Sequence, residues 1–119
     1  MKLSIWSSYY ADLSPEAAIA ELASHGFVWC ELSDEQSLAL MERGDPAAVG
    51  AAFGAYAREK GITVLQGHLT LKAKIGSEED LQKLLRQLIA AFLAMRCTRT
   101  DSSLEVARVL LQRVLRTLL

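Results

Sequence analysis

Acidic and imidazole side chains follow two apolar runs of this sequence. Glu31 comes directly after FVWC, Asp34 and Glu35 follow shortly after it, and His68 follows ITVLQG. Carboxylates together with a histidine are suitable ligands for a divalent metal such as zinc or manganese. We therefore take His68, Glu31 and Asp34 as candidate metal ligands. Glu31, Asp34 and Glu35 are candidate catalytic residues, because a carboxylate can orient a metal-bound water.

These residues also have structural explanations. His68 can be a polar residue at the start of a loop, and Asp34 and Glu35 suit the first turn of a helix, where acids meet the positive end of the dipole. Glu31 is more informative, because it directly follows an apolar run of strand length. His25, the only other histidine, precedes a helix-stopping glycine, and we expect it to have a structural role there.

The elements that would bring these side chains together alternate along the chain. Apolar runs at 2–6, 27–32 and 62–67 predict strands, and capped helical segments begin after Ser14, Ser33 and Asp45. Such alternation predicts parallel βα units with right-handed crossovers. Since parallel strands end at the same edge of a sheet, that edge should collect the following polar residues: Ser7, Ser8, Glu31, Ser33, Asp34, Glu35, Gln66 and His68. Trp6 and Trp29 are expected in the core.

The C-terminal third of the sequence breaks this rhythm. An amphipathic helix is predicted to start after Ser77, and the chain then continues through the polar turn RCTRTDSS to LEVARVLLQRVLRTLL. Ser102 and Glu105 have the spacing of a capping box for this last segment. Its apolar positions form so wide a stripe that it must pack on the sheet, on a partner helix or on another chain.

Composition limits the classes of function. The chain has 119 residues, 13 basic and 14 acidic, with a net charge of −1, so nothing in its charge favours nucleic-acid or membrane binding. The apolar runs are too short to span a bilayer and no signal peptide is recognisable, so we expect a cytoplasmic location. Cys30 is expected to be a buried free thiol, and a disulfide between Cys30 and Cys97 is the less favoured alternative, since nothing marks the chain as secreted. A nucleophile elbow, a Gly-rich phosphate loop and a dinucleotide fingerprint are all missing from the sequence.

Four segments carry a resemblance to a known family. They are MKLSIWSSYYADLSPEAAIAELASHGF, CELSDEQ, ERGDPAAVGAAF and GITVLQGHLTLKAKI. They resemble the N-terminal part of sugar phosphate isomerases/epimerases, of the xylose-isomerase-like barrel superfamily, over roughly residues 1–75. The resemblance implies a (β/α)8 barrel of about 250 residues, whose metal ligands come mainly from later strands than those present here. Gln36 stands where close relatives are expected to have histidine.

The expected fold class is α/β: a truncated (β/α) barrel fragment with about three parallel strands and four to five helices. Residues 1–95 would form the partial barrel unit, and 96–119 a C-terminal amphipathic helix unrelated to the family. Three parallel strands leave two open edges, so we expect self-association into a homodimer or higher oligomer to complete the unit. The alternative is a helix-rich swapped dimer with fewer strands.

The leading functional hypothesis is a metal-dependent phosphoester hydrolase, specifically a phosphodiesterase, whose site is built at strand ends in a homo-oligomer. The resemblance supports it, because the same superfamily includes apurinic endonucleases. Lys72 and Lys74 would contact the phosphate of a small substrate, or else they mark a solvated face. Two alternatives stay open: a catalytically inert, self-associating barrel fragment, and a residual sugar phosphate isomerase.

Overall fold

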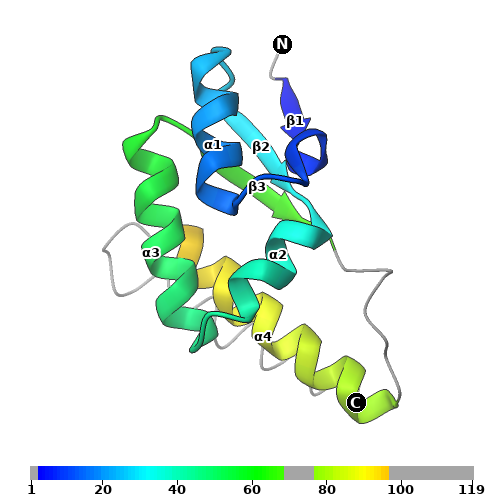
Figure 1. Cartoon of the computed structure of the whole chain (residues 1–119). Coiled ribbons are helices and arrows are strands. Elements are labelled where there is room, and N and C mark those ends of the chain that lie inside the picture. Colours follow the sequence, from blue (N-terminus) through cyan, green and yellow to red (C-terminus); the bar gives the residue numbers. More distant parts are fainter. Residues whose placement is uncertain (1–2, 69–76, 97–119) are drawn as a thin grey trace.

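Three parallel strands with helices between them form the fold in the computed structural model, which describes residues 3–68 and 77–96 (Figure 1). This confirms the predicted α/β class and its strand number, while self-association stays a prediction. Lys72, Lys74 and the segment 97–119 lie outside the described residues. The elements are β1 (Ser4–Trp6), the short 3-10 helix η1 (Ser7–Tyr10), α1 (Pro15–Ser24), β2 (Trp29–Leu32), α2 (Asp34–Met41), α3 (Pro46–Glu59), β3 (Thr63–Gly67) and α4 (Glu78–Arg96).

The sheet follows the order of the chain, β1-β2-β3, and both pairings are parallel. Each strand therefore returns to the sheet next to the previous one, as the strands of a (β/α) barrel do. Because the described residues keep all three strands, they do not show the helix-rich alternative. Within these residues β1 and β3 are each paired on one side only, so the sheet has two open edges.

The helix starts lie where the sequence predicts them. Proline occupies the first position of α1 and α3, where its missing N–H and fixed φ cost nothing. At each start a side-chain oxygen accepts a hydrogen bond from a backbone N–H that has no partner inside the helix. These bonds run from Ala17 N to Ser14 Oγ (3.2 Å), from Gln36 N to Ser33 Oγ (3.4 Å) and from Ala48 N to Asp45 Oδ2 (2.8 Å).

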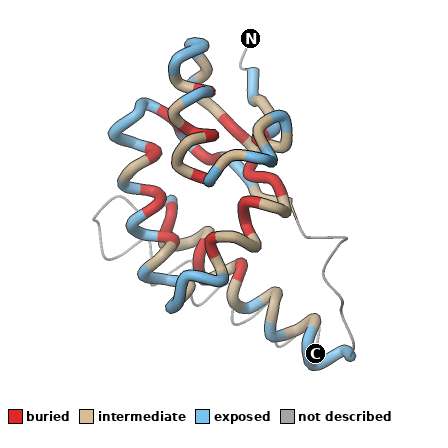
Figure 2. The backbone as a smooth tube through the Cα atoms, viewed as in Figure 1, coloured by how far each residue is buried: buried red, intermediate tan, exposed pale blue. Residues whose placement is uncertain are grey.

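The core lies between the sheet and the helices, and Figure 2 shows its buried segments facing one another across that layer. Strand residues alternate between the two faces of the sheet. Cys30, Leu32 and Val64 are buried toward the helices, whereas Glu31 and Gln66 point to the other face. The core cluster comprises Ile19, Leu22, Cys30, Leu32, Leu40, Phe53, Ala57, Ile62, Val64 and Met95.

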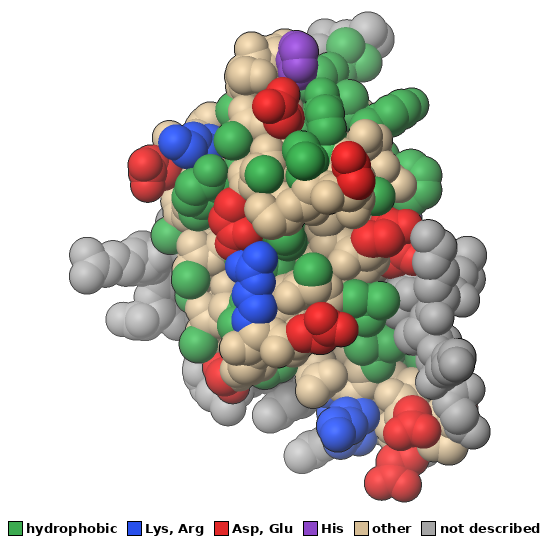
Figure 3. Space-filling view, in the orientation of Figure 1, with side chains coloured by type: hydrophobic (Ala, Val, Ile, Leu, Met, Phe, Trp, Pro, Cys, Tyr) green, Lys and Arg blue, Asp and Glu red, His purple; other side chains and the backbone are tan. Residues whose placement is uncertain are grey.

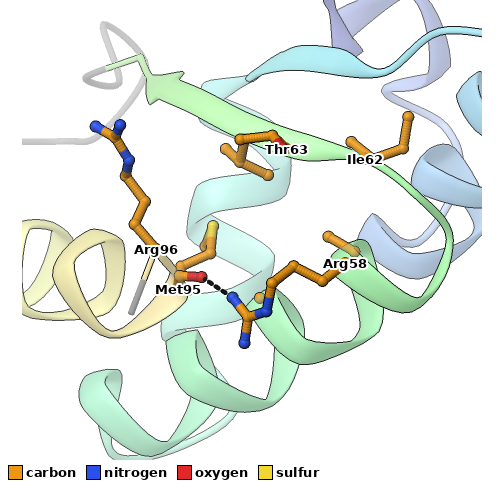
Figure 4. A pocket seen from close by; sticks show the side chains of 8 residues that line it. Arg58, Ile62, Thr63, Met95 and Arg96 are labelled. Atoms are coloured by element: carbon orange, nitrogen blue, oxygen red, sulfur yellow. Dashed lines mark hydrogen bonds between the residues drawn. The ribbon is translucent and has the colours of Figure 1, made fainter. Parts of the chain in front are cut away.

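Helices α3 and α4 approach each other closely through two glycines of α3. A Cβ atom on Gly50 would overlap the backbone of Ala91, and one on Gly54 would overlap the backbone of Met95. Arg58 Nη1 also donates a 2.8 Å hydrogen bond to the carbonyl oxygen of Met95, near the end of α4 (Figure 4). The missing side chains thus let α4 lie directly against α3, and Arg58 satisfies a carbonyl that the helix end leaves open.

On the face of the molecule in Figure 3, acidic and basic side chains are interspersed among apolar ones. Among the described helices, none combines the length and the apolar character needed to cross a membrane.

Candidate functional site

Four side chains meet where the carboxyl ends of the three parallel strands lie side by side, and we call them the edge cluster: Trp6, Glu31, Gln66 and His68. The strand register brings the first three together, because Trp6 of β1 pairs with Glu31 of β2, and Glu31 pairs with Gln66 of β3. His68 directly follows β3, and its backbone N–H donates to the carbonyl oxygen of Leu32 at 2.9 Å. The predicted convergence of Glu31 and His68 is therefore present in the structure.

Glu31 is the centre of the edge cluster. Its Oε2 atom accepts a hydrogen bond from Gln66 Nε2 at 3.0 Å and lies 3.0 Å from His68 Nε2. The ring of Trp6 lies against the imidazole of His68, with centroids 5.2 Å apart and the planes tilted by 41°. The side chains of His68 and Glu31 keep 37% and 31% of their exposure, so a small molecule can reach them from solvent.

A β-bulge positions the third strand for this contact. Cys30 pairs with Val64 but Glu31 pairs with Gln66, so Leu65 is an extra residue on β3. An extra residue turns the following side chains to the opposite face of the sheet. Val64 therefore stays in the core, while Gln66 reaches Glu31. The sequence reasoning missed this bulge, because ITVLQG has no glycine or proline before its end.

The loop after β1 is fixed to the start of α2 behind the edge cluster. Ser7 Oγ accepts a 2.8 Å hydrogen bond from the backbone N–H of Ser33, and both residues are fully buried. Gln36 Nε2 donates to the carbonyl oxygen of Tyr10 at 2.9 Å, and Gln36 is 1% exposed. Gln36, at the position where the family resemblance implies histidine, thus holds the loop that follows Trp6.

The other two predicted acids lie on α2. Asp34 and Glu35 occupy the first turn of α2, as their helix-start explanation predicts. Within residues 3–68 and 77–96, no hydrogen bond joins Asp34 to Glu31 or His68. Trp6, which was expected in the core, is 44% exposed, so that expectation was wrong. The cause is its place on the edge strand β1, on the side of the sheet opposite the buried Cys30.

The structure offers two adjacent metal-type ligands, Glu31 Oε2 and His68 Nε2. Three or more His, Cys, Asp or Glu side chains grouped to hold a metal ion are not found in the described part of the chain. Two ligands of one tetrahedral zinc lie about 3.3 Å apart, given zinc–ligand distances near 2.0 Å. The 3.0 Å between these two atoms is close to that value, so the pair suits a shared metal as well as a direct hydrogen bond.

Cys30 adjoins Glu31 on the opposite face of the sheet and is not a candidate nucleophile. Burial raises the pKa of its thiol to about 12, and the nearby charge of Glu31 adds to this effect. A thiol acts as a nucleophile only after ionisation, so this cysteine is inert at neutral pH.

Two of the cavities beside α4 are also lined by residues of β3. One of about 310 Å³ lies between the end of β3 and the apolar face of α4, and both Gln66 and His68 line it. The other, of about 190 Å³, lies between α3, β3 and the end of α4 and is lined by Arg58, Thr63 and Arg96. Figure 4 shows that Arg58 turns to the carbonyl of Met95 while Arg96 extends in another direction, so the two guanidinium groups do not converge on one point.

Comparison with known proteins adds a fold likeness. No protein-family model matches the chain, and no curated protein matches it. The crystal structure of D-psicose 3-epimerase in the presence of D-fructose is similar, with a TM-score of 0.58 and 18% sequence identity. The match covers 80% of this chain but 34% of the epimerase, so the chain spans about a third of that enzyme's length. At this identity the likeness concerns the fold: three strands and their helices arranged as in part of a sugar epimerase barrel.

Proposed function

We propose that the edge cluster binds a small polyhydroxylated carbohydrate and that Glu31 and His68 act together in proton transfer on it. The observation that carries the proposal is the contact of the Glu31 carboxylate with both His68 and Gln66, beside the exposed ring of Trp6. Carboxylate and amide groups hydrogen-bond hydroxyl groups, and an aromatic face packs against a sugar's C–H surface. The fold likeness to a sugar epimerase supports the same substrate class.

The chemistry that this pair suits is isomerisation next to a carbonyl group. The Glu31 carboxylate, as general base, takes the proton from a carbon adjacent to the carbonyl. His68, in its protonated form, donates a hydrogen bond to the oxygen on which negative charge develops. Return of the proton by Glu31 to the neighbouring carbon gives the isomer, as the proton of the adjoining hydroxyl moves to the former carbonyl oxygen. The epimer requires a proton delivered to the opposite face of the same carbon, which an acid from a second copy of the chain would supply. This deepens the residual isomerase alternative drawn from the sequence.

A single chain supplies only one wall of such a site. Trp6 is 44% exposed, the Glu31 side chain keeps 31% of its exposure, and both sheet edges are open within the described residues. A barrel encloses its substrate by loops from many strands, and this chain contributes three. We therefore expect the active form to be a homo-oligomer in which other copies of the chain supply the remaining walls.

Metal-dependent hydrolysis of phosphodiesters is the second candidate. It is favoured by the separation of Glu31 Oε2 and His68 Nε2, which suits adjacent ligands of zinc or manganese. Such a metal would lower the pKa of a bound water, while Glu31 and His68 hold the ion and a second copy completes the ligand set. Phosphate binding by Lys72 and Lys74 stays a prediction, since both lie outside the described residues.

Sugar binding is tested with D-fructose and D-psicose by saturation-transfer NMR and calorimetry. Glu31→Gln and Trp6→Ala should each weaken binding about tenfold. The first variant removes a charge-assisted hydrogen bond, and the second removes the aromatic surface on which the sugar packs. In D2O, the wild type should exchange the substrate hydrogen next to the carbonyl for deuterium, and Glu31→Gln should abolish this exchange.

Glu21→Gln is the matched control for Glu31→Gln, because Glu21 also lies beside a histidine, His25, at 3.8 Å but on an exposed helix. Wild-type binding in both Gln variants would refute the carbohydrate site.

The second candidate requires stoichiometric zinc or manganese and chelator-sensitive hydrolysis of bis(4-nitrophenyl) phosphate that His68→Ala removes. Absence of both activities and of bound metal would favour the inert fragment.

A further inference from the structure

The free edge of β3 is overhung by α4. The cavity of about 310 Å³ has the end of β3 on one side and, on the other, the apolar face of α4 formed by Leu85, Leu88, Ile89, Phe92 and Leu93. The ring of Phe92 packs where a Cβ atom of Gly67 would be, so α4 is held against the strand end. In a barrel of the similar kind, the next parallel strand pairs at this position and packs under the helix. The described residues thus leave a largely apolar groove between the end of β3 and α4, at the position where a further strand would pair.

The free edge of β1 has the opposite character. Trp6 of β1, Leu3 just before the strand and Tyr9 in the adjoining η1 are exposed by 44%, 59% and 76%. They line a shallow cavity of about 390 Å³ to which none of α1 to α4 contributes a residue. With Phe27 and Glu31 also lining this cavity, the exposed apolar surface runs from the β1 edge onto the face over β2. A strand with such an apolar edge could occupy the position beside β3 and under α4.

We propose that copies of this chain associate head to tail, with the free edge of β1 of one copy pairing in parallel with the free edge of β3 of the next. The two edges differ, one with an overhanging helix and one without, so the interface is heterologous rather than two-fold. In a two-fold pairing of β3 with β3, the overhanging α4 helices of both copies would occupy the same space beneath the joint. The head-to-tail joint avoids this conflict and continues the parallel order β1-β2-β3.

This joint also extends the edge cluster. Trp6, Glu31 and Gln66 form one row across the three strands, as their register shows. In the head-to-tail assembly, Trp6 of the second copy lies beside Gln66 and His68 of the first. The row then continues across the joint, and each cluster gains an aromatic wall from its neighbour. The association itself does not depend on the proposed substrate.

The test uses one blocking substitution at each edge of the full-length chain. Leu3→Glu places a charge on the β1 edge, and Ile89→Glu places one in the groove under α4. Each variant alone should lose self-association, with the apparent Kd raised at least about a hundredfold, because a carboxylate would be buried without a partner. Mixed in equal amounts, the two variants should form a heterodimer that grows no further, since one intact β1 edge meets one intact β3 groove.

Light scattering after size exclusion and sedimentation velocity measure these masses. The wild type should grow beyond a dimer as its concentration rises, while Val28→Glu, an exposed apolar position outside both edges, should behave as the wild type. Leu93→Glu, in the same groove, repeats the Ile89 test, and circular dichroism confirms that each variant is folded. A monomeric wild type, a closed dimer unaffected by Leu3→Glu, or a mixture that stays monomeric would each overturn the proposal. None of these measurements needs the sugar, so failure here is distinct from failure of the proposed function.

Discussion

Gly54→Ala should lower the free energy of unfolding by about 3 kcal/mol or more, because the new methyl group has no space between α3 and α4. A Cβ atom at this position would overlap the backbone of Met95, which cannot rotate away as a side chain could. Helix α4 would have to withdraw, and the hydrogen bond from Arg58 to the carbonyl oxygen of Met95 would be lost with it. Urea unfolding monitored by circular dichroism measures the change.

The direction of this effect is diagnostic. An exposed glycine in the middle of a helix normally gains about 0.5–1 kcal/mol on replacement by alanine. Ala55, the exposed neighbour of Gly54 on α3, gives the matched control, and Ala55→Gly should cost about 1 kcal/mol through helix propensity alone. A stabilised Gly54→Ala variant would contradict the close contact of the two helices.

In the folded protein, Cys30 should react with iodoacetamide about a thousandfold more slowly at pH 8 than it does in the unfolded chain. Its pKa is raised from 9.0 to about 12 by burial and by the charge of Glu31, so its thiolate fraction falls by about that factor. The measurement is made in a Cys97→Ser background, so that only one thiol reacts. Glu31→Gln should increase the rate modestly, because it removes the smaller of the two causes. A rate near that of the unfolded chain would contradict the burial of Cys30.

The same raised pKa predicts a loss of stability in alkali. Below pH 9 the thiol is neutral in both the folded and the unfolded chain, and its contribution is constant. Between pH 9 and about 12 the unfolded chain releases the proton and the folded chain keeps it, so stability falls by about 1.4 kcal/mol per pH unit. Other groups titrate in this range as well, and the difference between the wild type and Cys30→Ala isolates the contribution of this thiol. Parallel curves for the two proteins would refute it.

The features that the sequence predicted are those with local causes. Ser14, Ser33 and Asp45 cap helices with atoms only three residues away, so the sequence alone places these starts. The burial of Cys30 follows from its apolar neighbours in the same way. The α3–α4 contact could not be foreseen, because Gly50 and Gly54 read locally as weak helix formers. Their role depends on close contact with the backbone of Ala91 and Met95, about forty residues later in the chain.

The candidate site shows the same division. Glu31 and His68 were correctly placed at one edge, since strands of a parallel sheet end together. Gln66 was placed at that edge, but its contact with Glu31 depends on the bulge at Leu65, which periodicity could not reveal. Trp6 was expected in the core, and its exposure reflects its place on the open edge strand β1 rather than its residue type. The predicted metal and phosphate ligation remain predictions.

The bulge at Leu65 has a consequence for how such a protein can change over generations. On one side of it, Val64 is fixed by the packing of the core, and a shift there would expose every buried side chain of the strand. On the other side, the number of residues between Val64 and the strand end decides which residues reach Glu31, and Gly67 must stay beside Phe92. Insertion or deletion of a single codon after Val64, with a glycine kept beside Phe92, would exchange the groups offered to a ligand and leave the buried side chains in place. The bulge thus separates the core-packed half of β3, which tolerates little change, from the strand end, whose side chains can change and so alter the chemistry of the site.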